Sequence, residues 1–291
     1  MTGTVGVFCA RTRVEEKQLI AAFAGLGREA LPVSPVAAPA PLGPTPVQPL
    51  AETSVSGAAA EMLIDRLQDR ELAAMVLRSK RAAGASIFGA GIAATEDRHA
   101  VALTLARAGI ARPTSYAVFD ELTALDAIAT AGYPSTFLAL TPKTADLTMF
   151  DRDTAEAVME HREMLRDKHD AMGLVQVGIK GVSATVIVAG GNVVGVDGDQ
   201  SIANGAAFDL AIATANALQA DIIGVVICAT SSGYVVWDID PVPDFRNAVA
   251  TGGTDVATAI ILSITASAGT VPLPSMLITA WEANHNVLAC G

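Results

Sequence analysis

Two carboxylates set two positions apart give the strongest chemical signal in the sequence. Asp238 and Asp240 close an apolar, β-branched run that begins at Tyr234, and this spacing puts both side chains on one face of a strand, with Ile239 on the other. Carboxylates on one face can hold Mg²⁺, which takes hard oxygen ligands and few protein contacts. A polar strand end in water would show the same spacing. Because Pro241 follows at once, we expect the pair to lie at the strand end rather than in the ladder.

The segment around this pair resembles a known family. The run WDIDPVPDFRN is similar to the closing segment of ATP-grasp ligases of the RimK/LysX type, in which a Glu-x-Asn pair on this strand binds magnesium. The resemblance places Asp238 and Asp240 at the metal positions, and it implies a substrate-binding role for Arg246, Asn247 and Asn204. In this family ATP phosphorylates a carboxylate, and an amine then attacks the acyl phosphate. The resemblance therefore implies Mg²⁺ and ATP as cofactors if the chain is active, and otherwise none.

The positions that hold phosphate in these ligases differ here. The resemblance places the first phosphate lysine at Arg98, which opens a predicted helix, and the second at Leu138 or Ala139, neither of which can contact phosphate. The loop that follows, 141–146, contains no glycine, and glycine is what lets backbone amides approach a phosphate closely. Lys143 is the cation in that loop. Arg98 and Lys143 are thus the candidate nucleotide-binding residues.

Three further positions of the resemblance are substituted. The glutamate near the adenine falls on Gln176, the arginine after it near Ser183, and the first acidic metal ligand on Val226. Electrostatic groups carry most of the rate in phosphoryl transfer, and losing one can cost about a hundredfold to a thousandfold. The pattern favours a degenerate, non-catalytic partner or regulatory subunit of an active ligase, in an amino-acid ligation pathway such as that of glutamate. An active ATP-dependent carboxylate–amine ligase and a small-molecule-binding protein remain as alternatives.

Helix and strand patterns alternate along the chain and predict an α/β fold, with α+β character in the ATP-grasp part. With the resemblance, they divide it into a Rossmann-like N-terminal domain (1–94), a central small ATP-grasp subdomain (95–170), a large C-terminal subdomain (171–269) and a tail (270–291). Five prolines in the segment 36–50 predict an extended loop. The glycines at 89 and 91 lack the third glycine of a dinucleotide loop, so they predict a domain junction instead.

Composition limits the partners. The chain of 291 residues has a net charge of −11, which argues against nucleic acid. We find no apolar run long enough to span a membrane, no signal-peptide pattern and no metal spacing among the three cysteines. We therefore expect a cytoplasmic protein with no nucleic-acid or membrane partner. Its apolar composition suits association, as a homo-oligomer or in a hetero-complex with a related ATP-grasp ligase.

Overall fold

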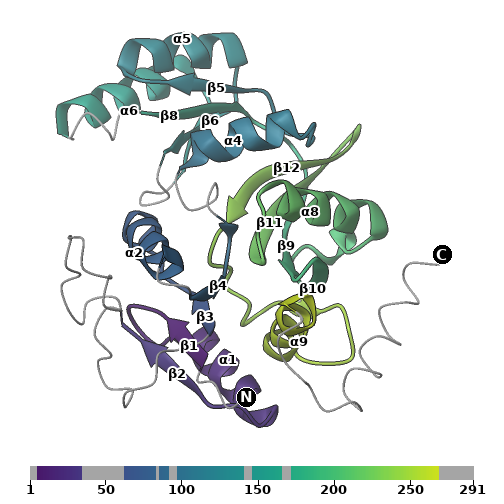
Figure 1. The fold of residues 1–291 in the computed structure, drawn as a ribbon. Coiled ribbons are helices and arrows are strands. Elements are labelled where there is room, and N and C mark those ends of the chain that lie inside the picture. Colours follow the sequence, from purple (N-terminus) through teal and green to yellow (C-terminus); the bar gives the residue numbers. More distant parts are fainter. Residues whose placement is uncertain are drawn as a thin grey trace.

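The computed structural model describes residues 5–34, 62–82, 85–91, 97–140, 146–165 and 172–268. These residues form three sheets with helices packed on them, which appear as three lobes in Figure 1. The predicted α/β fold is confirmed. The proline-rich segment 36–50, Lys143 and the tail 270–291 lie outside the described residues. In the part that is described, no helix is both long and apolar enough to cross a membrane.

The N-terminal lobe is a parallel sheet with the strand order β2-β1-β3-β4. Parallel neighbours need crossover connections, and helices α1 and α2 supply two of them, packing on opposite faces through separate apolar clusters. This arrangement is Rossmann-like. Its elements are β1 (Val5–Phe8), α1 (Val14–Gly25), β2 (Ala30–Val33), β3 (Met62–Asp65), α2 (Arg70–Ala82) and β4 (Ser86–Phe88).

The central lobe is an antiparallel sheet with the order β5-β8-β6-β7. Helices α5 and α6 pack against it through one apolar cluster, whereas α4 lies between this sheet and helix α8 of the next lobe (Figure 1). The sequence did not predict the short strand β7. The elements are α4 (Arg98–Arg107), β5 (Ser115–Val118), α5 (Glu121–Ala131), β6 (Ser135–Ala139), β7 (Leu147–Met149), α6 (Arg152–Leu165) and β8 (Gly173–Val177).

The large C-terminal lobe is an antiparallel sheet with the order β12-β11-β9-β10-β13. Gly190 and Gly191 join β9 to β10 in a hairpin with φ values of +53° and +79°, a left-handed turn that suits glycine. The elements are β9 (Ser183–Ala189), β10 (Asn192–Gly198), a 3₁₀ turn η1 (Gln200–Ile202), α8 (Gly205–Ala217), β11 (Ile222–Thr230), β12 (Gly233–Asp240), β13 (Val249–Ala250) and α9 (Val256–Ala268).

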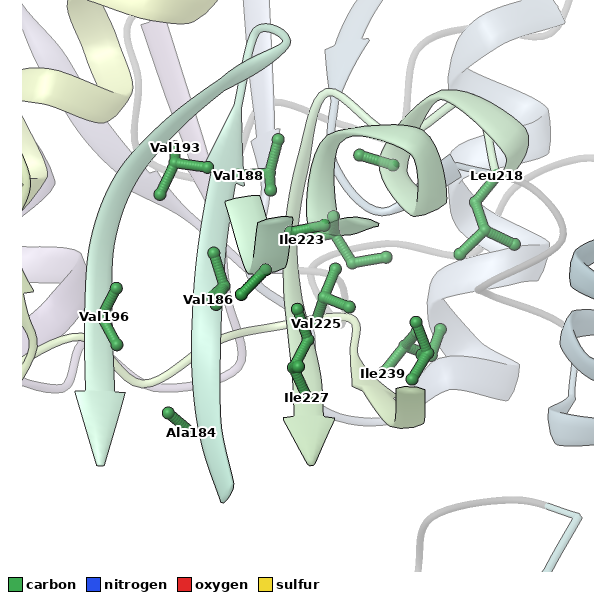
Figure 2. Close-up of a cluster of buried hydrophobic side chains, with 14 of the residues drawn as sticks. Ala184, Val186, Val188, Val193, Val196, Leu218, Ile223, Val225, Ile227 and Ile239 are labelled. Carbon is green, nitrogen blue, oxygen red and sulfur yellow. The ribbon is translucent and has the colours of Figure 1, made fainter. Parts of the chain in front are cut away.

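Two apolar cores cover the two faces of this large sheet. On one face, alternate residues of β9 and β11, such as Val186 and Val225, pack with helix α8 (Figure 2). On the other face, Ile187 packs with helix α9, which in turn contacts α1 of the N-terminal lobe. The N-terminal lobe and the large lobe therefore share one continuous core.

The segment that follows β4 packs tightly against the large lobe. The carbonyl oxygen of Gly89 accepts hydrogen bonds from the N–H groups of Asp221 (2.8 Å) and Ile222 (3.1 Å). A Cβ atom on Gly91 would lie 2.2 Å from the carbonyl oxygen of Leu218. These two glycines let this segment approach the large lobe closely.

A β-bulge at Trp237 orients the two candidate carboxylates. Val226 pairs with Asp238 and Ile227 pairs with Val236, so Trp237 is the extra residue. Val236 and Ile239 both lie in the core beneath α8, a spacing of three that is possible only because the bulge reverses the alternation.

Asp238 and Asp240 therefore share the opposite face of β12, as predicted. They lie within the ladder, however, where Asp240 pairs with Gly224. The expectation that they lie outside it was wrong, because Pro241 ends the strand only after Asp240 has paired.

Candidate functional site

A cavity of 270 Å³ lies where residues of all three lobes meet. Side chains come from the N-terminal lobe, from the first turn of α4, and from strands β11 and β12 with the segment after them. Its lining contains both candidate metal ligands and one candidate phosphate ligand. The lining residues are Gln68, Arg70, Arg98, Val226, Asp238, Ile239, Asp240, Pro241 and Val242.

Arg98 lies at the centre of the polar contacts here. It is the first residue of α4, whose N-terminus is capped by the Asp97 carboxylate. One guanidinium nitrogen, Nη2, donates to Asp238 Oδ2 at 2.7 Å. The other, Nη1, donates to Asp146 Oδ1 at 2.9 Å and to the carbonyl oxygen of Ala139 at 3.2 Å. The predicted phosphate cation is thus bonded to the predicted metal ligand.

Two further charged side chains, Asp146 and Arg112, interact with the pair of Arg98 and Asp238. Burial raises the pKa of Asp146, with Asp238 adding to the effect and Arg98 opposing it. Burial lowers the pKa of Arg112, and the Asp238 carboxylate opposes that shift. Neither Nε nor Nη1 of Arg112 has a hydrogen-bond partner in the described parts of the chain. Asp238 therefore bonds to the guanidinium of Arg98 and also interacts with the charge of Arg112.

Hydrogen bonds also join the central lobe to strand β12 directly. The Gln176 side chain accepts from Ser115 Oγ at 3.1 Å and donates to the carbonyl oxygen of Trp237 at 3.0 Å. The N–H of Val236 donates to the carbonyl oxygen of Ala111 at 2.9 Å. Gln176 is fully buried and used in this bridge.

Beside this bridge, side chains fill the space between the central lobe and the large lobe. The gap that remains is too narrow to admit a water molecule. Its lining consists of Arg98, Val101, Leu105, Arg112, Leu138, Leu174, Val236, Asp238 and Ile239.

Asp240 differs from Asp238 in its partners. Its Oδ1 accepts from the N–H of Val242 at 3.0 Å, and no ion pair to it occurs among the described residues. Burial raises its pKa, opposed in part by backbone N–H groups and by the charge of Arg66. Arg66 itself is committed elsewhere: it donates to Glu16 Oε1 at 3.1 Å and to the carbonyl oxygen of Pro243 at 2.9 Å.

The three candidate substrate ligands lie outside the cavity lining. Arg246 Nε donates to Glu15 Oε1 at 2.9 Å and Nη2 donates to Asp244 Oδ2 at 2.9 Å, which fastens the large lobe to α1. Asn247 is exposed. Asn204 caps α8 and donates to the Tyr234 hydroxyl at 2.6 Å. A substrate role for these residues stays a prediction, as does a nucleotide role for Lys143, which the structure does not describe.

Several residues of the site escaped the sequence analysis. Arg70 and Gln68 come from the loop after β3 and the start of α2, and Arg112 and Asp146 come from the central lobe. A polar residue just after a parallel strand is the general signal for such a position, since ligands bind outside the carboxyl ends of strands. That signal applies to Gln68 and Arg70, whereas Arg112 and Asp146 depend on how the lobes pack.

The residues present are a poor fit to magnesium and nucleotide. Mg²⁺ needs near-octahedral oxygen ligation, from one or two carboxylates together with waters and phosphates. Here Arg98 already occupies Asp238, and the third position, Val226, lies in the cavity wall as an apolar side chain. Within the described ranges no group of three or more His, Cys, Asp or Glu could hold a metal ion.

Comparison with known proteins supports the fold assignment. No protein-family profile and no curated protein sequence matches this chain. Among solved structures, the chain is similar to a RimK domain ATP-grasp protein from Sphaerobacter thermophilus, with 27% sequence identity and a TM-score of 0.72. That match covers 90% of this chain and 99% of the other.

Two more distant matches share the fold. The ATP-grasp ligase PsnB matches with 15% identity and a TM-score of 0.62, over 91% of this chain and 98% of its own. The D-alanine–D-alanine ligase of Bacillus anthracis matches with 12% identity and a TM-score of 0.58, over 99% of each chain. With the three-sheet architecture, these likenesses show that the chain has the ATP-grasp fold, and the 27% identical match to a RimK domain protein covers nearly all of both chains.

Proposed function

We propose that this chain is a non-catalytic ATP-grasp protein, which serves as a partner or regulatory subunit of an active ligase of the same fold. It would act in a cytoplasmic amino-acid ligation pathway, such as one that uses glutamate. The 2.7 Å contact between Arg98 and Asp238 is the observation that carries this proposal. A cation at a phosphate position and a carboxylate at a metal position neutralise each other, so neither is free for nucleotide or metal.

The reaction of the family explains why the mutual neutralisation of Arg98 and Asp238 would prevent catalysis. Transfer of a phosphoryl group depends on preorganised cations around the transferring charge, and each lost group can cost about a hundredfold to a thousandfold. Three positions lack their charge or ligand here, since Leu138 lies buried in β6, Gln176 is bound to Trp237, and Val226 is apolar. Losing several such groups from one site would leave too little electrostatic stabilisation for catalysis at an ordinary enzymatic rate.

Surface composition supports association with a partner. Large apolar side chains on the central lobe are more than half exposed, at Phe119 (59%), Leu122 (73%), Phe150 (70%) and Met164 (77%). Contiguous exposed apolar side chains are typical of protein–protein contact surfaces, and these four belong to the same lobe. A homo-oligomer or a hetero-complex with a related ATP-grasp ligase would cover them.

Calorimetric titration of the full-length protein with ATP and MgCl₂ tests the proposal. We expect no saturable binding, and no ADP release when amino acids are supplied as substrates. Binding in the micromolar range together with ADP release would overturn it. Sedimentation of the same sample, alone and mixed with an active RimK-type ligase, would show whether a homo-oligomer or a mixed complex forms.

An active, divergent carboxylate–amine ligase is the second candidate. It is favoured by the position of Asp238 and Asp240, which line one cavity with Arg98, and by the structure of PsnB in complex with Mg and ADP. If this candidate is correct, Asp238→Ala abolishes a measurable ADP release, because a carboxylate at a metal position is lost. If the chain is non-catalytic, the wild type and the variant both release none.

A further inference from the structure

Helices α5 and α6 form the outer layer of the central lobe. Both pack on the sheet β5-β8-β6-β7, on the side away from the other two lobes (Figure 1). Each helix buries one side against that sheet, through Ala124 and Ile128 on α5 and through Ala155 and Met159 on α6. The opposite side of each helix is exposed.

The course of the chain brings the first turn of α5 to the same end of the lobe as the last turn of α6. Helix α5 follows the end of β5, where Gly173 pairs, and leads back to the start of β6 at the opposite end of the strands. Helix α6 follows β7, which ends opposite Ser135, and runs the other way. The two helices pack on each other as an antiparallel pair, so Leu122 on α5 and Met164 on α6 lie at the same end.

Exposed apolar side chains occupy that end, and carboxylates follow along both helices. Phe119, Leu122 and Met164 are each more than half exposed. Asp126 comes four residues after Leu122, and Glu160 comes four residues before Met164; both are exposed. Residues four apart lie on one side of a helix, so each carboxylate shares the outward side with an apolar neighbour. We call these five residues the α5–α6 face.

The α5–α6 face is acidic, and neither helix supplies a lysine or an uncommitted arginine to it. Helix α5 contains no lysine or arginine. Helix α6 contains two arginines. Arg152 is paired with Glu156 at 2.6 Å, and Arg162 lies buried over the ring of Phe137 at 4.6 Å.

This charge bears on what can cover the face. A symmetric dimer through it would bring the same surface patch of two copies together, and with it Asp126 and Glu160 of one copy against those of the other. Placing like charges opposite each other across an interface is costly. A partner that presents lysine or arginine beside an apolar stripe is complementary to the face.

We propose that the α5–α6 face docks a basic amphipathic helix of a partner protein. Its apolar stripe packs on Phe119, Leu122 and Met164, and its lysine or arginine side chains lie against Asp126 and Glu160. Two packed helices present ridges and grooves along which a third helix can lie, and an amphipathic helix is a common form of recognition element. The inference rests on the proposed partner role, and it specifies a hetero-complex at this face.

Three labelled peptides test the face by fluorescence anisotropy with the full-length protein. The first has leucine at helical spacing and lysine elsewhere, the second has the same composition with the leucines spread around the helix, and the third has glutamate in place of lysine. We expect the first to bind most tightly and to lose affinity as salt rises, because exposed charge pairs are screened. The proposal is overturned if the first peptide does not bind, or if either of the others binds as tightly.

Apolar variants locate the binding. Leu122→Ser and Met164→Ser each remove one apolar contact, and we expect each to weaken the first peptide by about 10-fold. Met75→Ser is the matched control, because Met75 is 63% exposed on α2, in another lobe. Far-ultraviolet circular dichroism verifies that each variant is folded. Affinities of the two face variants equal to that of the control overturn the proposal.

Charge variants give a second, independent measurement. Asp126→Lys and Glu160→Lys should weaken the first peptide and reduce its dependence on salt, because each places a cation opposite the lysines of the peptide. Asp209→Lys, at an exposed carboxylate on α8, changes the net charge by the same amount and should have a smaller effect. An equal effect of all three variants would mean that the peptide responds to net charge alone, which contradicts the proposal.

The outcomes separate this proposal from the proposed function. ATP binding with ADP release would overturn the non-catalytic role, whereas peptide binding that ignores the face variants would overturn only the docking face. Sedimentation of the protein alone provides the last comparison. An oligomer that dissociates in both Leu122→Ser and Met164→Ser would show that a second copy covers the face, and it would overturn the basic helix as its occupant.

Discussion

The guanidinium of Arg98 and the carboxylate of Asp238 lie 2.7 Å apart and join helix α4 of the central lobe to strand β12 of the large lobe. Both side chains are largely buried, at 11% and 14% exposed. Breaking one partner of such a pair leaves the other charge without compensation, which is more costly than never having built the pair. The contact therefore neutralises two buried charges and also holds the central lobe against the large lobe.

Replacing Arg98 with Met tests this link. We expect the free energy of unfolding to fall by about 3 kcal/mol, because Asp238 and Asp146 both lose their cation. Urea denaturation followed by circular dichroism measures the change. The matched control is Arg152→Met, which breaks the pair of Arg152 with Glu156 at an 80% exposed side chain and should leave the stability almost unchanged. Equal losses in the two variants would contradict this account.

The junction between the N-terminal and large lobes predicts a different outcome for two glycines. Gly91→Ala should destabilise the protein by more than about 3 kcal/mol, since the new Cβ would lie 2.2 Å from the carbonyl oxygen of Leu218. Gly109→Ala is the control, because Gly109 has a similar φ of +68° with no atom within 4 Å of the added Cβ. It should cost only the backbone strain, about 1–2 kcal/mol. Similar melting temperatures for both variants would show that the close approach is unimportant.

Gln176 should matter for stability through its bridge to β12. Gln176→Leu removes the donor to the carbonyl oxygen of Trp237 and the acceptor for Ser115, and we expect a loss of about 1–3 kcal/mol. Gln200→Leu serves as the comparison, because Gln200 is exposed and bonds only to nearby carbonyl groups of β10. The melting temperatures of both variants measure this difference. An unchanged melting temperature for Gln176→Leu would show that the bridge does not stabilise the protein.

Acid sensitivity follows from Glu16, which is fully buried at the start of α1. Burial alone would raise its pKa, but the hydrogen bonds from Arg13 and the charge of Arg66 outweigh burial and lower it. A lowered pKa in the folded state gives stability that is present above the unfolded-state pKa and lost as the pH falls through the folded one. The wild type should therefore lose stability from about pH 4.3 downward through this group.

Glu16→Gln removes that contribution. We expect it to cost about 3 kcal/mol at neutral pH and to flatten the acid side of the stability profile. Glu156→Gln, at an exposed pair, should change neither. Urea denaturation at a series of pH values provides the measurement, and a Glu16→Gln profile parallel to that of the wild type would rule the mechanism out.

Much of the fold could be predicted from the sequence, because periodicity and turn residues are local signals. The apolar pattern over 206–218 predicts a helix there, and the structure has α8. The β-branched runs on either side of the turn at 230–233 predict two strands, and the structure has β11 and β12, each longer by a few residues. Strand β7 was missed because three residues carry too little periodicity to be distinguished from a loop. The bulge at Trp237 was missed because it depends on the pairing of β11 with β12 and not on residue type.

The candidate site was predictable only in part. The spacing of Asp238 and Asp240 correctly put both on one face, since that depends on strand geometry alone. The pairing of Asp238 with Arg98 joins residues 140 positions apart, and the placement of Arg70 depends on the docking of an entire lobe. Charge pairing over such separations is fixed by tertiary packing, so a single sequence carries no local signal for it.

The bridge from the central lobe to β12 has a consequence for solubility. β12 is an outer strand of the large sheet, and an outer strand offers N–H and C=O groups on which another chain can add by strand pairing. Here the N–H of Val236 is bound to Ala111 and the carbonyl oxygen of Trp237 to Gln176, and the bulge distorts the strand between its paired segments. The contacts that hold the central lobe against β12 therefore also protect the protein against edge-to-edge aggregation.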